Sequence, residues 1–474
     1  MNYQDITKKI REYKYWILLI FVFILVRIIV AVAYYFANLD IGGWNNIYAY
    51  TDLSYNVVTM KHLFKATCGG LPFYFVFTSF VQAIYDSHWS VYVAQIFATF
   101  FTFYFSYKSI RLYFSKNVAV ATLLLLVIDP FYAWYNFMFA SGNLFCLFFA
   151  SGLYNFLLFI RNKQTKNLVY FSLLISISVL VRATGILLIQ VFSVIFIILF
   201  FYYKFFEKEK NFFGVKTLLL SILFMNFCYA LFVGGAVIKN KIDYNDYRLA
   251  PDLMTNVYFF NVPELLSLQE GISNGEARKR LTDIASREID FNITNIGDCN
   301  SMGQEKFNLF LDYVNKEGKK YIWENWFAYS KIHFYKMIPY YLQSGYFQMY
   351  EGYFGSKKKP NISSAIMNGE IKVVFDFVKK FNAPVAIYFF GIAYWGLASF
   401  SMFFTLIYSW FKDREKFVYI LIINILTLYL AFTVSPFIMP RYKIIAYPFF
   451  LLSLMYFISI VLNYIKSHKI REKL

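Results

Sequence analysis

Apolar runs of about 20 residues recur along most of this chain, separated by short polar segments. A run of that length crosses the bilayer core as one helix, so the pattern predicts an all-α polytopic membrane protein with about ten transmembrane helices. The first run follows the basic stretch "KKIREYK" and precedes no small-residue cleavage pattern, which indicates a retained helix rather than a signal peptide. The expected spans are 15–36, 89–107, 117–137, 142–160, 168–182, 184–203, 216–237, 384–411, 417–434 and 444–464.

The basic residues indicate how these helices are oriented, because cytoplasmic loops of membrane proteins are enriched in Lys and Arg. With the N-terminus inside, the short cytoplasmic segments hold most of the basic residues. The short outer segments hold only Lys61, Lys65, Arg182, Arg441 and Lys443. We therefore expect both termini in the cytoplasm. The expected location is a bacterial inner or plasma membrane, with the endoplasmic reticulum as the less favoured alternative. This distribution also accounts for the net charge of +18 without a nucleic-acid partner.

A shorter apolar stretch, "LPFYFVFTSFVQAIY" at 71–85, would reverse every later loop if it crossed the membrane. Its length and aromatic content favour a helix that lies in the outer interface. The chain then divides into an N-terminal membrane domain with a first outer loop, an extracytoplasmic domain, and C-terminal membrane helices. The residue ranges are 1–237 with the loop at 37–88, 238–383, and 384–474. Helical periodicity with polar breaks predicts that the extracytoplasmic domain is mainly helical.

The cysteines and histidines give no sign of a metal site. Cys146 and Cys228 fall within spans and are expected to be packing residues. Cys68 and Cys299 both fall outside the membrane, where a disulfide is chemically allowed and two free thiols are the alternative. The four histidines are scattered, and the sequence contains no Gly-rich phosphate-binding loop. We therefore expect neither a metal nor a cofactor.

Charged residues within the spans or at their ends are candidates for function, because a charge in the bilayer is costly. Arg27 lies about halfway along the first helix, where a bond to Asp129 or to a helix-end carbonyl would be a purely structural role. Asp129 precedes Pro130, so a helix cap or a bend is expected there. Arg182 and Arg441 lie at outer helix ends and could contact lipid headgroups. Arginine also binds phosphate oxygens through two parallel hydrogen bonds, which suggests a specific phosphate instead.

Four short motifs occur in a recognisable order: "D..Y...M..L" in the first outer loop, "GGLPFY", "LVRATGILL" at an outer turn, and a late "P.RY...AYP". This order resembles the GT-C superfamily of polytopic glycosyltransferases, in particular members similar to protein mannosyltransferases and aminoarabinose transferases that use polyprenyl-phosphate-linked sugars. The chain departs from that pattern in two places. It has "GLP" where two prolines are usual, and it has Gly142 and Asn143 where many relatives carry an acidic residue.

The resemblance implies transfer of a sugar from a polyprenyl-phosphate donor to a glycan, lipid or protein acceptor on the extracytoplasmic face. An inverting displacement of this kind needs a base for the acceptor hydroxyl and cations for the leaving phosphate. Asp52 is the expected general base, with Asp40 as the alternative, and Arg182 and Arg441 are expected to bind the phosphate. The residues expected to support the site are Tyr55, one helical turn from Asp52, Arg27 and Tyr442.

Two other functions stay open on the sequence. A polymerase or ligase that acts on lipid-linked oligosaccharide also has many helices, a large outer loop and outer arginines. A transporter or flippase more often has two similar halves and helices interrupted near mid-membrane, and the sequence shows neither feature. A lipid phosphate bound beside Arg182 and Asp52 would support transfer, whereas one bound in a central channel would support transport.

Overall fold

The computed structural model describes residues 3–36, 72–207, 213–250, 252–291, 293, 304–354, 372, 376, 379, 383–436 and 439–471. Every secondary-structure element in these ranges is a helix, which confirms the predicted all-α class. The helices of the main bundle are α1 (Tyr3–Phe36), α4 (His88–Arg111), α5 (Lys116–Ile128), α6 (Pro130–Tyr135), α7 (Gly142–Asn162), α8 (Thr165–Val181), α9 (Leu188–Tyr202), α10 (Val215–Tyr229), α20 (Ala383–Lys412), α21 (Arg414–Val434) and α23 (Tyr447–Arg471).

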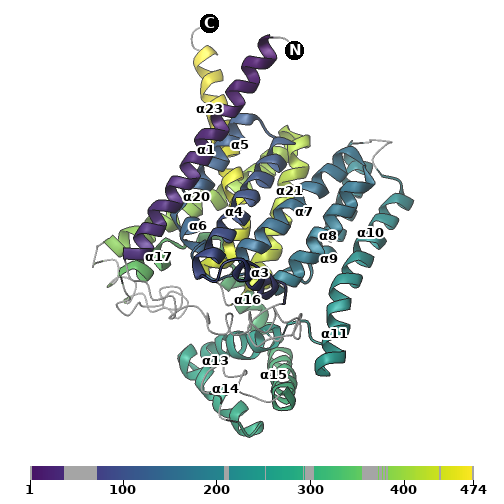
Figure 1. The fold of residues 1–474 in the computed structure, drawn as a ribbon, viewed down its shortest axis with the longest axis vertical. Helices are drawn as coiled ribbons and strands as arrows, with labels where there is room; N and C mark the ends of the chain where they lie inside the picture. Colours follow the sequence, from purple (N-terminus) through teal and green to yellow (C-terminus); the bar gives the residue numbers. More distant parts are fainter. Residues whose placement is uncertain are drawn as a thin grey trace.

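The remaining helices lie at or beyond one end of this bundle (Figure 1). They are α3 (Pro72–Ile84), α11 (Gly235–Tyr244), α12 (Asp252–Asn256), α13 (Val262–Glu270), α14 (Asn274–Glu288), α15 (Gln304–Glu324), α16 (Trp326–Leu342), α17 (Tyr346–Phe354) and α22 (Pro440–Lys443). Short 3-10 or π segments complete the described structure: η2 (Ala183–Gly185), η3 (Tyr203–Glu207), η4 (Ala230–Gly234), η5 (Val257–Asn261) and η7 (Ile444–Ala446).

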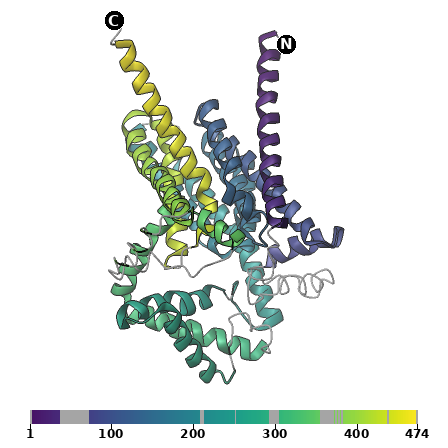
Figure 2. The ribbon, with the colours of Figure 1, turned by 90° about the vertical axis from the view of Figure 1, so that its left-hand side faces the viewer.

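Both termini lie at one end of the bundle, and the layer formed by α13, α14 and α15 lies at the other (Figures 1 and 2). Within the bundle, α7 packs between α4 and α8, while α23 packs on α5 and α20. Helix α3 lies across the end of the bundle nearest the helical layer, as expected for a helix in the interface. This arrangement agrees with a topology in which the termini share one side and the helical layer lies on the other.

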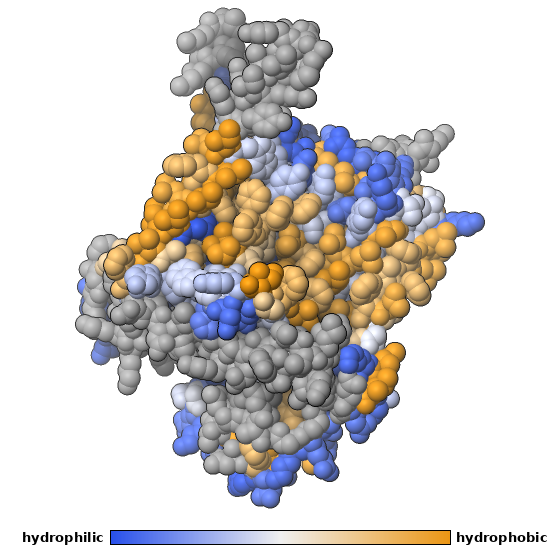
Figure 3. Space-filling view, in the orientation of Figure 1, coloured by the Kyte–Doolittle hydropathy of each residue, from blue (hydrophilic) through white to orange (hydrophobic). Residues whose placement is uncertain are grey.

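Helix length and composition identify seven candidate membrane spans in the part of the chain that the structure describes. Shorter apolar helices occur at Phe73–Ile84, Lys116–Ile128 and Thr165–Val181. The number of ten crossings therefore stays a prediction, although the bundle has a helix at each expected span. On the face shown in Figure 3, apolar side chains form a broad band across the bundle, with hydrophilic residues gathered on either side of it. That distribution is typical of a protein surrounded by lipid.

The predicted span 117–137 is two helices rather than one. Helix α5 ends at Ile128, and Pro130 is the first residue of α6. A proline disfavours helical geometry in the residue before it, which explains the break at Asp129. The Asp129 carboxylate caps α6 by accepting a hydrogen bond from the Tyr132 backbone N–H at 2.7 Å. The expected cap and bend at this residue are thus confirmed.

The small helices beyond the bundle have a hydrophobic core of their own, centred on Phe259, Leu281 and Leu311. This core joins η5, α13, α14 and α15, as the helical periodicity of the sequence predicts. Helices α16 and α17 instead pack on the bundle, where α16 contacts α20 and α21 and α17 contacts α6 and α20. The domain boundaries at 238 and 383 stay a prediction. Cys146 and Cys228 are buried free thiols, whereas Cys68 and Cys299 lie outside the described residues.

Candidate functional site

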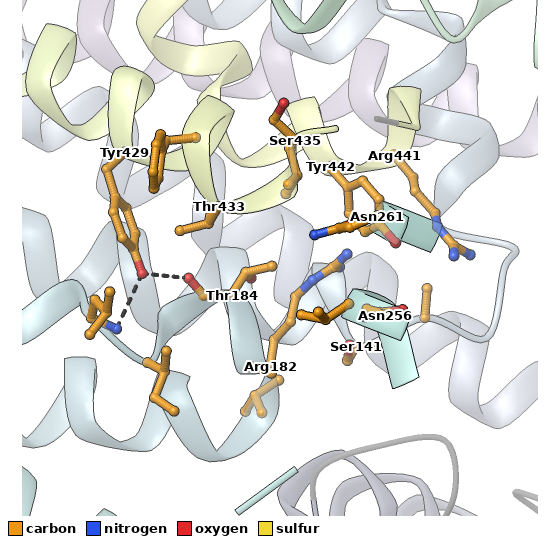
Figure 4. A pocket seen from close by; sticks show the side chains of 18 of the residues that line it. Ser141, Arg182, Thr184, Asn256, Asn261, Tyr429, Thr433, Ser435, Arg441 and Tyr442 are labelled. Atoms are coloured by element: carbon orange, nitrogen blue, oxygen red, sulfur yellow. Dashed lines mark hydrogen bonds between the residues drawn. The ribbon is translucent and has the colours of Figure 1, made fainter. Parts of the chain in front are cut away.

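A cavity of about 470 Å³ opens at the end of the bundle that is nearest the small helical layer (Figure 4). Its walls come from α3, the α6–α7 connection, the α8–α9 turn, η5, α16, the end of α21 and α22. Among the described residues that line it are Tyr74, Tyr135, Ser141, Arg182, Thr184, Asn256, Asn261, Tyr329, His333, Tyr429, Thr433, Ser435, Arg441 and Tyr442. Arginine and histidine supply the titratable nitrogen groups, and no carboxylate occurs among these described lining residues.

The two arginines predicted from the sequence meet at one tyrosine. The guanidinium carbon of Arg182 lies 5.0 Å from the centre of the Tyr442 ring, and that of Arg441 lies 5.4 Å from it. Figure 4 shows Tyr442 between the two arginine side chains. The guanidinium group of Arg182 has no hydrogen-bond or ion-pair partner in the part of the chain that the structure describes. Two planar cations beside an accessible cavity can bind the oxygens of a phosphate.

The local backbone explains why Arg182 points into the cavity. Helix α8 ends at Val181, and Arg182 is extended, with φ −152° and ψ 129°. The following turn is held against α21 by the Tyr429 hydroxyl, which donates to the Thr184 carbonyl at 2.7 Å and accepts from the Leu187 N–H at 3.2 Å. The backbone that carries Arg182 is therefore held in place by hydrogen bonds to the neighbouring helix.

Gly142 explains one departure from the family pattern. A Cβ atom at this position would lie 2.4 Å from the Tyr135 hydroxyl and 2.9 Å from a terminal nitrogen of Arg182. An acidic side chain does not fit there while Arg182 keeps this position. The neighbouring Asn143 is fully buried and bonds to other polar groups, accepting from the Asn136 amide at 3.0 Å. Neither residue supplies a charge to the cavity.

Arg27 does not line the cavity. Its guanidinium donates to the Val127 carbonyl at 2.6 Å and to the Asn136 side chain at 3.4 Å, and it lies 4.0 Å from the centre of the Phe23 ring. The sequence left Asp129 or a helix-end carbonyl as the structural partner of Arg27, and the structure shows the bond to the carbonyl. Asp129 is bonded instead to the Tyr346 hydroxyl at 2.7 Å. A role of Arg27 in the site therefore gains no support from its position.

Sequence reasoning missed a hydrogen-bonded chain on the opposite wall of the cavity. The Nε2 atom of His333 lies 2.9 Å from the Phe432 carbonyl, which can only accept, so Nε2 carries the hydrogen. Its Nδ1 atom then accepts from the Tyr329 hydroxyl at 3.2 Å. The same hydroxyl accepts from the Asn261 amide at 3.0 Å. Burial lowers the pKa of His333 below its usual value, and the bond to Phe432 opposes that shift.

This chain links three parts of the fold: η5 of the small helical layer, α16, and the end of α21. The available sequence signal was weak. Tyr329 and His333 are four residues apart, which places two polar groups on the same side of a mostly apolar helix. The contacts to Asn261 and Phe432 join residues 68 and 99 positions apart, so no local pattern could reveal them.

The predicted bases and their neighbour, Asp52, Asp40 and Tyr55, lie outside the described residues. Helix α3 begins at Pro72, and its first turn supplies Tyr74 and Phe75 to the cavity wall. In the described ranges, no group of three His, Cys, Asp or Glu side chains is placed to hold a metal ion.

Residues 69–229 match the family model described as dolichyl-phosphate-mannose-protein mannosyltransferase. No curated protein is significantly similar in sequence. Among solved structures, the archaeal oligosaccharyltransferase AglB from Archaeoglobus fulgidus, in complex with an inhibitory peptide and a dolichol-phosphate, has a similar fold. The TM-score is 0.50 at 14% sequence identity, over 97% of this chain and 52% of that one. The chain thus spans about half the length of AglB.

The resemblance to the GT-C superfamily is confirmed. Both comparisons are with glycosyltransferases, a mannosyltransferase family and an oligosaccharyltransferase. The matched part of the chain runs from residue 69, before α3, to the end of α10 and includes Arg182. Arg441 and Tyr442 lie beyond it, and the fold rather than the family match brings them to the same cavity.

Proposed function

We propose that this GT-C protein is a glycosyltransferase that takes a sugar from a polyprenyl-phosphate donor at the extracytoplasmic end of its bundle. The observation that carries the proposal is the pair of guanidinium groups, Arg182 and Arg441, on either side of Tyr442 in the cavity. A lipid phosphate sits at the membrane surface, and the cavity lies where the helices end. The likeness to AglB, solved with a dolichol-phosphate, supports the same class of donor.

The proposed reaction requires groups that bind the phosphate, groups that bind the sugar and a general base. The leaving phosphate is already ionised at neutral pH, so it needs charge stabilisation rather than a general acid. Arg182 and Arg441 supply that charge, and the amides and hydroxyls of Asn256, Asn261 and Thr433 can bond to sugar hydroxyls. The acceptor hydroxyl must lose a proton as the anomeric carbon is attacked with inversion. Asp52 is the proposed base, and Asp40 is the alternative.

The acceptor is proposed to approach from the side of the small helical layer. Asn256, at the end of α12, and Val257 and Asn261 of η5 form part of the cavity wall on that side. A glycan, a lipid or a protein segment are the acceptor classes that this entrance admits. A polymerase or ligase of lipid-linked glycans would use the same phosphate contacts, whereas a transporter would need its phosphate site in a central channel.

Transfer from labelled polyprenyl-phosphate sugars by the purified protein tests this proposal. Arg182→Met and Arg441→Met should each lower transfer by an amount equivalent to about 2 kcal/mol or more, because each removes charge-assisted hydrogen bonds. Lysine at either position keeps the charge without the fork geometry and should give a smaller loss. Arg161→Met is the matched control, since Arg161 bonds to the Leu112 carbonyl at the opposite end of α7. Full transfer by both Met variants would refute the phosphate assignment.

The same assay ranks the two proposed bases. Asp52→Asn is nearly isosteric, so donor binding should survive while turnover falls by about 10²–10⁴-fold. Asp40→Asn should be much milder. The reverse ranking would move the base to Asp40, and normal turnover in both variants would remove the carboxylate base from the mechanism.

A further inference from the structure

Helix α16 carries an exposed row of apolar side chains on its outward face. Phe327 is 70% exposed, Phe334 is 64% exposed and Ile338 is 51% exposed. The spacing of seven and four residues places all three on one side of the helix. His333, Met337 and other buried residues occupy the opposite side, which faces the cavity and the bundle. The outward side of this helix thus exposes large apolar side chains, unlike that of a helix on a water-facing surface.

The turn that precedes α16 adds two exposed indole rings. Trp323, at the end of α15, is 80% exposed, and Trp326, at the start of α16, is 62% exposed. Contiguous apolar surface of this kind is uncommon on soluble domains and marks a contact with a protein or a membrane. Tryptophan and tyrosine in particular gather where a bilayer meets water.

The row on α16 continues into the surface of a predicted membrane span. Tyr341, one turn beyond Ile338, packs its ring against that of Phe403 with centroids 5.8 Å apart. Phe403 belongs to α20, lies within the apolar span Val385–Lys412, and is 52% exposed. Figure 1 places α16 between the bundle and the helical layer. The outward face of α16 is therefore an extension of the surface that α20 presents to lipid.

We infer that α16 lies in the outer interface of the bilayer with this face toward lipid, and that Trp323 and Trp326 lie among the headgroups. Exposed basic side chains at the same corner, Lys319, Lys320 and Lys331, complement anionic lipid headgroups. Lys331 lies in the apolar row, where its flexible stem allows the ammonium group to reach the headgroups. The inference goes beyond the proposed transferase function and does not depend on it.

The consequence is that α16 separates the cavity from the membrane. One side of the helix supplies Tyr329 and His333 to the cavity, and the other contacts lipid. A membrane contact would also fix the height of the small helical layer, because α13 is joined to α16 by the ion pair between Glu264 and Lys336 at 2.8 Å. The layer is then held at the membrane surface rather than free in solution.

Photo-crosslinking of the whole protein in lipid nanodiscs tests this inference. p-Benzoylphenylalanine is introduced singly at Phe327, Phe334 or Ile338, in discs of phosphatidylcholine and phosphatidylglycerol, and adducts are identified by intact-mass spectrometry. Leu309 is the matched control, because it is an apolar residue of α15 that is 57% exposed but lies off this face. Using three separate positions means that one poorly folded variant does not decide the result.

We expect adducts of lipid mass at Phe334 and Ile338 that are at least tenfold more abundant than at Leu309. The abundance at Phe327 should be intermediate between these two levels. A phosphatidylglycerol share above its share in the disc would further support contact of the basic corner with anionic headgroups. Crosslinked dimers at Phe334 or Ile338 would show that a second copy covers this face and would overturn the inference. Equal, low lipid labelling at all four positions would overturn it as well.

Discussion

Tyr442 contacts two like charges, since the guanidinium carbons of Arg182 and Arg441 lie 5.0 and 5.4 Å from the centre of its ring. Each cation gains from the negative face of the ring, but the two cations repel each other. A phosphate that bonds to both guanidinium groups would offset that repulsion. At the scale of single residues, the position of Arg182 also depends on the small residue beside it, Gly142.

The first prediction concerns Gly142. In Gly142→Ala, the new methyl group would meet the Tyr135 hydroxyl and the Arg182 guanidinium, so both must shift. We expect the affinity for polyprenyl phosphate to fall by roughly tenfold, equivalent to about 1.4 kcal/mol. Gly275→Ala in α14 is the control, because nothing lies within 4 Å of the added atom and alanine favours a helix by up to about 1 kcal/mol. Unchanged phosphate affinity in Gly142→Ala would contradict this account.

The second prediction concerns pH and His333. The unfolded chain protonates this histidine near pH 6.5, whereas burial lowers its pKa in the folded protein. The unfolded state therefore binds the proton first, so stability is complete above about pH 6.5 and decreases as the pH falls below it. His333→Gln keeps a donor for the Phe432 carbonyl but does not titrate. Its melting temperature, measured from pH 5 to 7.5, should fall less steeply with acidity than that of the wild type.

At the scale of the elements, a buried lysine holds α22 against the end of α16. Lys443 ends α22 and is 1% exposed, and its ammonium group donates to the Tyr341 carbonyl at 2.7 Å and lies 3.4 Å from the Gln343 carbonyl. The rings of Trp395 and Phe450 lie 4.0 and 4.6 Å from it. The carbonyl end of a helix attracts cations, so this contact fastens the element that carries Arg441 to the end of α16.

The third prediction follows from that contact. Lys443→Met keeps the side chain's length and removes its bonds to α16, so the turn with Arg441 and Tyr442 loses its fixed position. Removal of a buried charge stabilises the folded state, whereas the loss of a donor for the Tyr341 carbonyl destabilises it, so the two effects oppose each other. We therefore expect phosphate affinity to fall by about tenfold while the melting temperature changes little. Lys336→Met removes a buried lysine that pairs with Glu264 and should leave phosphate affinity unchanged. A loss of equal size in both variants would argue against a specific role for Lys443.

Sequence patterns predicted elements better than they predicted contacts. Long apolar runs identify helices because each run is a local property, and the Asp129–Pro130 pair located the break between α5 and α6. Arg182 and Arg441 could be chosen from their depth and charge alone. His333 could not, because its partners are a carbonyl in α21 and a tyrosine whose other bond comes from η5. The π-helical turn η5 likewise has no reliable sequence signal.

At the scale of the whole molecule, the two termini share one end of the bundle and the small helical layer occupies the other. The fourth prediction is that reporters at both termini are cytoplasmic, whereas reporters inserted near residue 56 or residue 300 are extracytoplasmic. The reason is the enrichment of Lys and Arg in the loops on the side of the termini. Accessibility to a membrane-impermeant reagent checks it. A cytoplasmic signal near residue 56 would reverse the orientation and remove Asp52 from the proposed site.

Arg27 has a consequence for the order in which the protein is made. Its guanidinium bonds to Val127 and Asn136, which follow it by 100 and 109 residues. When α1 leaves the ribosome, these partners have not yet been synthesised, and a lone arginine is unfavourable in the hydrocarbon core. We expect α1 to stay beside the insertion machinery, with Arg27 reaching toward water, until α5 and α6 arrive. Helix α1 thus reaches its final place only after α5 and α6 have entered the membrane.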